Sequence, residues 1–173
     1  MKKLIIAFLG VALFFGMFTQ NVKAQSSITA QAYAEVIAAL TATETSQLNF
    51  GRFSPEQQGG QINLSPQGEL NTSGSLVLAG GTHNPASFNI TGQTDASFSI
   101  SLPSTPAILT NFSNSKTMTV SGWESLPPAG IGAGVLKGGS LAVNVGATLT
   151  VGSMNDNPVG VYSGTYSITF AYN

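Results

Sequence analysis

Short segments in which apolar and polar residues alternate recur through most of this chain, and they constrain its fold more than any other feature. A period of two residues is typical of a β-strand with one buried face. Glycine, proline, asparagine and serine separate the segments, as they do in turns. Many short strands at this spacing, without interleaved helices, indicate an antiparallel sandwich or barrel. The predicted strands are residues 36–44, 48–53, 60–65, 74–80, 86–92, 97–103, 116–124, 139–152 and 162–173.

The two most regular alternations lie near the end of the chain. Residues 140–152 place apolar side chains on one face, and Gly146 within them indicates a bulge or a bend that lets one long strand serve two sheets. The last fifteen residues, "VGVYSGTYSITFAYN", alternate again. Two glycines on the face expected to be buried leave shallow places for a neighbouring backbone or a large side chain. That face carries Gly160, Tyr162, Gly164, Tyr166, Ile168, Phe170 and Tyr172.

The first 24 residues have the features of a secretory signal peptide. Two lysines precede an apolar run from Leu4 to Phe18, and Val22 and Ala24 are the small residues before a cleavage point. A membrane-spanning helix is the alternative, but a span needs roughly 20 apolar residues and this run has fifteen. We therefore expect an exported protein that is not an integral membrane protein after cleavage.

Cleavage after residue 24 leaves 149 residues, which fit one domain with a substantial core. This mature chain has three basic and seven acidic side chains, hence a net charge of −4. Such a balance gives no means to neutralise a phosphate backbone, so no nucleic acid is expected as a partner. The chain has no cysteine, which excludes disulfides and cysteine zinc sites. A surface of uncharged polar residues suits an extracellular protein whose copies pack together, and also an ordinary secreted domain.

The segment from Ile28 to Ala42 fits two interpretations. Its even positions are apolar, but a single strand of this length would extend about 50 Å at roughly 3.3 Å per residue, beyond the usual strand. We therefore expect an N-terminal arm over residues 25–35, followed by a β-sandwich domain over residues 36–173. The competing interpretation is a helix, because "AQAYAEVIAAL" is rich in helix-forming residues. The apolar positions of the arm are Ile28, Ala30, Ala32 and Ala34.

Each motif that resembles a chemical site has a simpler structural interpretation. His83 lies in a turn without partners for a triad or a metal site, so a solvated or capping role is expected. The "GIGAG" of residues 130–134 follows two prolines rather than a strand, so it is predicted as a flexible loop and not a dinucleotide-binding turn. Residues 155–157, "NDN", carry one acidic side chain, too few for a calcium cage, and are predicted as a turn.

The carboxylates and the single tryptophan also have simpler structural interpretations. Glu56, Glu69 and Glu124 are too widely spaced to argue for paired carboxylate chemistry. Trp123 either binds the face of a sugar or is half-buried in the core or at an edge, and we favour the second. We therefore expect no catalytic residues, no cofactor and no metal, and rank an enzyme last among the possible functions.

Several stretches, in order from about Leu48 to Asn173, resemble a family of secreted bacterial proteins known as domain of unknown function forty-four-oh-two. Members of that family look like pilin or spore-coat-U domains of the adhesin group. The resemblance therefore implies an all-β, antiparallel, immunoglobulin-like β-sandwich of the pilin type. The matching stretches are "LNFGRF", "INLSPQGEL", "LVLAGGTHNPASFNITG", "SISLP", "LAVNVGATLTVG" and "GVYSGTYSITFAYN".

The chain end also resembles subunits of chaperone–usher pili, which end in a strand with a penultimate aromatic residue and a glycine fourteen residues from the end. Here Tyr172 is penultimate and Gly160 is fourteenth from the end. The resemblance implies that the C-terminal strand pairs with a periplasmic chaperone or another subunit. It also implies that the domain lacks its last strand and that the arm of the next subunit supplies it. The alanines of this arm are small for groove anchors.

Two functions from different classes follow from these observations. The first is a non-enzymatic structural surface protein, a fimbrial or pilin-like subunit that assembles by donor-strand complementation and contributes to adhesion. Its partners would be copies of itself or related pilin subunits, with a periplasmic chaperone and an usher. It would pass through the periplasm to the cell surface, a fimbrium or the medium. The alternative is a monomeric secreted binding module that recognises a surface glycan or protein.

Overall fold

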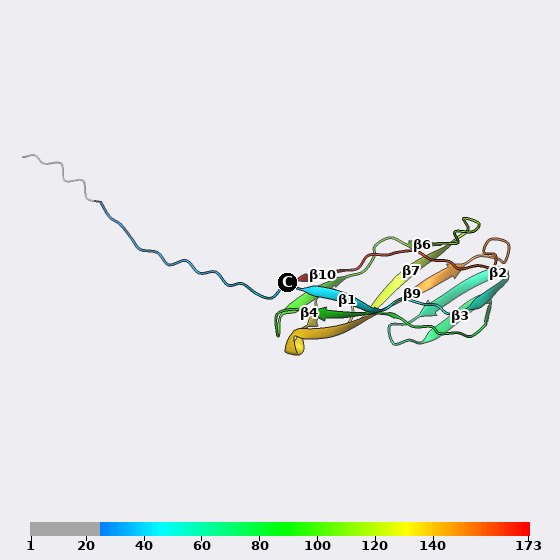
Figure 1. Cartoon of the computed structure of the whole chain (residues 1–173), viewed down its shortest axis with the longest axis horizontal. Coiled ribbons are helices and arrows are strands. Elements are labelled where there is room, and N and C mark those ends of the chain that lie inside the picture. Colours follow the sequence, from blue (N-terminus) through cyan, green and yellow to red (C-terminus); the bar gives the residue numbers. More distant parts are fainter. Residues whose placement is uncertain (1–24) are drawn as a thin grey trace, which may run out of the picture. The chain divides into compact units, whose positions relative to one another are not determined.

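The computed structural model describes residues 25–173, and the predicted signal peptide, residues 1–24, lies outside the described residues. Contacts divide the chain into a unit that ends at Glu35 and a second unit, Val36–Asn173. Residues 25–40 form no helix and no strand, and Figure 1 shows the β-strands that follow them. The elements are β1 (Thr41–Ser46), β2 (Phe53–Leu64), β3 (Leu70–Leu78), β4 (Ala86–Thr91), β5 (Ser97–Ser101), β6 (Ala107–Thr110), β7 (Thr117–Leu126), β8 (Gly130–Val135), the 3₁₀ turn η1 (Lys137–Gly139), β9 (Ser140–Val151) and β10 (Thr169–Tyr172).

The strands form two antiparallel sheets in a sandwich-like arrangement. In the larger sheet the neighbours are β1-β4-β9-β2-β3, and β7 pairs with the remaining edge of β9 and carries β6 beyond it. The smaller sheet has the order β10-β5-β8. This architecture confirms the predicted all-β class and the antiparallel sandwich.

Two clusters of buried apolar side chains form the core, and β9 contributes to both. The face of β9 predicted to be apolar is buried: Val143 and Val145 join one cluster, and Leu149 and Val151 join the other. Full burial of a Val or Leu side chain contributes about 1.5–3 kcal/mol to the stability of the fold. Trp123 of β7 packs against both clusters, so it is the half-buried core tryptophan that we favoured.

The strand β9 changes its neighbour at Gly146. Residues up to Val145 pair with β4, and residues from Ala147 onward pair with β2. A Cβ atom at position 146 would lie 2.2 Å from the carbonyl oxygen of Leu64, so this approach of two backbones requires glycine. The predicted irregularity at Gly146 is real, but it marks a change of partner within the larger sheet rather than a passage between sheets.

The prediction of a flexible loop at residues 130–134 is wrong, because these residues lie in β8. Their backbone pairs with β5 from Ser97 to Ile100. The glycine composition has a packing reason, since a Cβ atom at Gly134 would lie 2.3 Å from the Phe98 ring. The buried Phe98 therefore sits directly over the backbone of this edge strand.

Other element boundaries also differ from the predictions. No helix forms over Ile28 to Ala42, and the first strand begins at Thr41 rather than at residue 36. Residues 48–52 form only an isolated bridge, between Asn49 and Asn84. The strand β6 was not predicted, because it has only four residues and follows a proline-rich turn.

We predict that Gly146→Ala lowers the free energy of unfolding by about 1–3 kcal/mol, the usual cost of overpacking. Backbone atoms of residues 64–66, rather than a flexible side chain, would meet the new methyl group. Urea unfolding followed by the fluorescence of the single tryptophan measures the loss. Thr150→Ala, at an exposed position of the same strand, is the control and should change stability by less than about 0.5 kcal/mol. Equal stability of the two variants would contradict the close approach at Gly146.

Candidate functional site

The C-terminal segment, residues 160–172, runs antiparallel to two successive strands. Ser163 exchanges backbone hydrogen bonds of 2.8 and 3.1 Å with Thr110 at the end of β6. Farther along, β10 pairs with β5, with Thr169 opposite Ser101 and Tyr172 opposite Phe98. The proline-rich turn between β5 and β6 interrupts the partner, because proline cannot donate a hydrogen bond to a ladder. The segment therefore begins beside the larger sheet and ends in the smaller one.

Side chains of the C-terminal segment alternate in burial as the sequence pattern predicts. The residues between them, from Val161 to Ala171, are exposed, whereas the large residues of the other face are only partly buried. Half-burial leaves apolar surface that a further strand can cover. The partly buried residues are Tyr162, Tyr166, Ile168, Phe170 and Tyr172.

The two glycines of this segment permit close approaches, as the sequence analysis expected. A Cβ atom at Gly164 would lie 2.1 Å from the carbonyl oxygen of Ile108, and one at Gly160 would lie 2.1 Å from the side-chain nitrogen of Asn111. The neighbours are thus the backbone of β6 and a buried amide in the loop after it. Both glycines serve the attachment of this segment to the edge of the larger sheet.

Aromatic contacts anchor the segment to the core. The Phe170 ring centroid lies 5.8 Å from that of Phe88 and 6.2 Å from that of Phe98. Tyr166 stacks on Trp123 with a centroid distance of 4.7 Å. Such pairs contribute about 0.5–1.5 kcal/mol beyond their burial, so β10 is held by side chains as well as by its short ladder.

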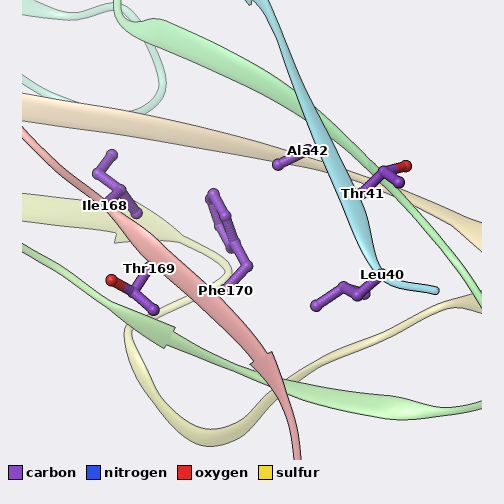
Figure 2. Close-up of a pocket in the computed structure, with 6 residues that line it drawn as sticks. All are labelled: Leu40, Thr41, Ala42, Ile168, Thr169 and Phe170. Carbon is purple, nitrogen blue, oxygen red and sulfur yellow. The ribbon is translucent and has the colours of Figure 1, made fainter.

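An open groove lies between β1 and β10, with a volume of about 280 Å³. Figure 2 shows Leu40 and Ala42, at the start of β1, and Ile168 and Phe170, at β10, directed toward the space between the strands. Thr41 and Thr169 point away from it (Figure 2). The side chains directed into the groove are therefore apolar, and its two walls belong to different sheets.

Both walls of the groove are sheet edges. Among the described residues β1 pairs only with β4, and β10 pairs only with β5. The outer backbone N–H and C=O groups of both strands thus have no ladder partner. Unpaired edges of this kind are templates for a strand from another chain.

The hydroxyl of Tyr172 closes one end of the groove. It donates to the carbonyl oxygen of Ala38, at 2.9 Å, and accepts from the backbone N–H of Gln93, at 2.6 Å. Position 92 must be glycine for this, because a Cβ atom there would lie 2.1 Å from the hydroxyl. The sequence indicated a buried aromatic ring at Tyr172 but gave no signal for these two bonds.

Near the middle of the C-terminal segment lie two buried polar atoms without partners. The hydroxyl of Tyr166 and the indole nitrogen of Trp123 make no hydrogen bond within the described chain. Burial raises the pKa of the Tyr166 phenol from 10.0 to about 12, and the carboxylate of Glu44 on β1 adds to the rise. The phenol therefore keeps its proton at neutral pH.

The arm is described only within its own unit. Ile28 is 92 % exposed, and Ala30, Ala32 and Ala34 are also exposed, with no strand or helix formed around them. The structure therefore brings the predicted C-terminal residues together on one face but does not combine them with the arm residues. It adds a wall that the sequence analysis did not name as a site, at Leu40 and Ala42, although both belong to the apolar even positions of residues 28–42.

The remaining candidates have structural positions. His83 is exposed in the loop before β4. In the predicted turn at 155–157, the buried Asn157 donates to the carbonyl of Thr117, at 2.8 Å. The hydroxyl of Ser153 lowers the pKa of Asp156, which accounts for this carboxylate as a turn residue. Within residues 25–173 no group of three or more metal-ligating side chains gathers, and none of the described helices could cross a membrane.

Comparison with protein families gives a match over most of the chain. The family described as "Domain of unknown function (DUF4402)" matches residues 40–172. The match includes both walls of the groove and ends at Tyr172, while the arm lies before it. Comparisons with curated proteins and with solved structures give no match.

We predict that the buried phenol of Tyr166 makes stability depend on alkaline pH. A phenol with a higher pKa in the folded chain holds its proton more tightly there, so its contribution is complete below about pH 10 and is lost as the pH rises toward 12. Tyr166→Phe removes a hydroxyl that has no partner and should therefore flatten this decline. Urea unfolding at several pH values around 10 and above measures both proteins. Parallel declines would contradict the burial of this hydroxyl.

Proposed function

The chain belongs to the DUF4402 family, and we propose that it is a non-enzymatic structural surface protein, a fimbrial, pilin-like subunit of immunoglobulin-like fold that assembles by donor-strand complementation. In this proposal the arm of one copy, residues 25–35, enters the groove between β1 and β10 of another copy. The observation that carries it is the pair of unpaired strand edges facing each other across an apolar groove.

Backbone pairing supplies the first argument. A strand laid in the groove pairs its N–H and C=O groups with an edge strand, and each hydrogen bond contributes about 0.5–1.5 kcal/mol net. The arm has eleven residues, as many as residues 162–172 of the C-terminal segment. At roughly 3.3 Å per residue, both extend about 36 Å. An arm of this length can therefore cover the whole half-buried face.

Side-chain size supplies the second argument. The acceptor face already carries large rings and branched side chains, which leave little depth in the groove. Small donor residues suit such a face, and Ala30, Ala32 and Ala34 are the smallest side chains that still bury a methyl group. Ile28 is the one large apolar side chain on the alternating face of the arm. The small residues of the arm thus match the acceptor rather than weaken the proposal.

The groove is poorly suited to a small molecule. Ligand pockets typically have volumes of about 300–1,000 Å³ and a few converging polar groups. This groove has about 280 Å³, and the two threonines at its border point away from it (Figure 2). An apolar trough between two strand edges instead suits an extended chain.

Export and assembly partners are part of the same proposal. A signal peptide over residues 1–24 would send the chain to the periplasm, where a chaperone would cover the C-terminal strand until an usher joins the subunits. The assembled protein would lie at the cell surface, in a fimbrium or in the medium, and would contribute to adhesion. Assembly by strand addition is head-to-tail, so it produces filaments rather than closed dimers.

We predict that mature chains, residues 25–173, form oligomers and fibres, and that removal of residues 25–35 abolishes them while the domain stays folded. Sedimentation and electron microscopy measure assembly, and circular dichroism measures folding. Fibres formed without the arm would contradict its donor role. A fully stable monomer of the intact mature chain would instead favour the secreted binding module.

We also predict that Ile28→Asp reduces assembly at least about tenfold, because a carboxylate would enter an apolar groove and its burial is costly. Thr29→Asp is the matched control, since it places the same charge on the outward-facing side of an extended arm. The midpoint concentration of assembly compares the two variants. Equal midpoints would show that the arm does not bury its even positions.

A further inference from the structure

Three strongly exposed apolar residues flank the bridge that attaches the C-terminal segment to β6. Phe112, in the loop after β6, is 82 % exposed, and Val161, at the start of the C-terminal segment, is 83 % exposed. Each lies two residues beyond the bridge between Thr110 and Ser163, on the side of the loop that follows β6. Val159 is also fully exposed. We call Phe112, Val159 and Val161 the distal patch.

The distal patch and the groove share the C-terminal segment. The distal patch occupies the beginning of the same segment whose later residues form one groove wall, and the side chain of Asn111 contacts Gly160 between its members. The loop that carries Phe112 lies at the end of the domain away from the C-terminus (Figure 1). A strand that follows the groove away from Tyr172 therefore arrives at this patch.

The closed end of the groove determines the direction of an incoming strand. At that end Tyr172 binds the backbone of Ala38, where the acceptor's own chain enters its fold. A second folded domain attached there would have to share this space. The incoming domain therefore lies at the open end, and its arm runs antiparallel to the C-terminal segment.

The alternation of apolar residues along the arm then determines which arm residue lies opposite which residue of the C-terminal segment. With Ile28 opposite Phe170, Ala30 lies opposite Ile168, and the apolar positions of both strands share one face. In this register residues 25–35 of the arm lie opposite residues 163–173. The same register brings residue 37 of the incoming copy opposite Val161.

The residues that follow the arm are apolar and exposed. Val36 is 97 % exposed and Ile37 is 48 % exposed, and both belong to the folded unit rather than to the arm. Resting on the proposed function, the geometry points to a second contact between copies: Val36 and Ile37 of the incoming copy dock on the distal patch of the acceptor. Apolar surfaces that are exposed in each copy are then covered together.

Engineered cysteines test this contact, because the natural chain has none. A full mature chain with both Ile37→Cys and Val161→Cys should form a ladder of disulfide-linked copies after mild oxidation, seen on a non-reducing gel. Each single variant should stop at dimers. The control chain carries Ile37→Cys and Val77→Cys, because Val77 is comparably exposed, at 51 %, but lies on the edge strand β3. It should give no ladder above dimers.

The outcomes separate the two proposals. The ladder should disappear when Ile28→Asp is added, and Phe112→Ser should weaken assembly about tenfold while the arm remains able to bind. Arm-dependent fibres without the ladder would overturn the docking of residues 36 and 37 but leave donor-strand assembly standing. Chains that never assemble through the arm would overturn both proposals.

Discussion

The structure depends on one constraint: the two strands that border the groove, β1 and β10, do not pair their backbone N–H and C=O groups with each other. β1 is the edge of the larger sheet and β10 is the edge of the smaller one. Because they lie in different sheets, their free edges face a common groove without forming a ladder. An unpaired edge that also borders apolar surface is a liability for a monomer and a binding site for an added strand.

The C-terminal segment creates this situation by following partners in both sheets. It starts against β6, where Gly164 allows contact with the backbone of Ile108, and it ends against β5. Its aromatic rings fill the interior from the side, and the hydroxyl of Tyr172 joins the last strand to Ala38 before the first one. The groove is thus held at a defined width by core packing and by two hydrogen bonds.

The sequence was informative where a pattern is local. Alternation identified β9 and the face of the C-terminal segment, because a half-buried strand must alternate. It could not show that only residues 169–172 form a ladder strand, since pairing depends on a partner interrupted by Pro103 and Pro106. It also predicted a loop at residues 130–134, because the fit of Phe98 over Gly134 is a tertiary contact. The groove itself required two distant segments to meet, which no local pattern contains.

One feature of β1 has a mechanical meaning for a filament built in the proposed way. The strand follows the arm after residues 36–40 and is hydrogen-bonded to β4 over Thr41–Ser46. When tension through the arm acts parallel to the axis of this strand, the ladder between β1 and β4 is loaded in shear. The rungs that join it to β4 then share the load at the same time instead of opening one after another. A subunit whose linking arm leads into a ladder loaded in shear resists extension far better than one whose ladder opens one hydrogen bond at a time.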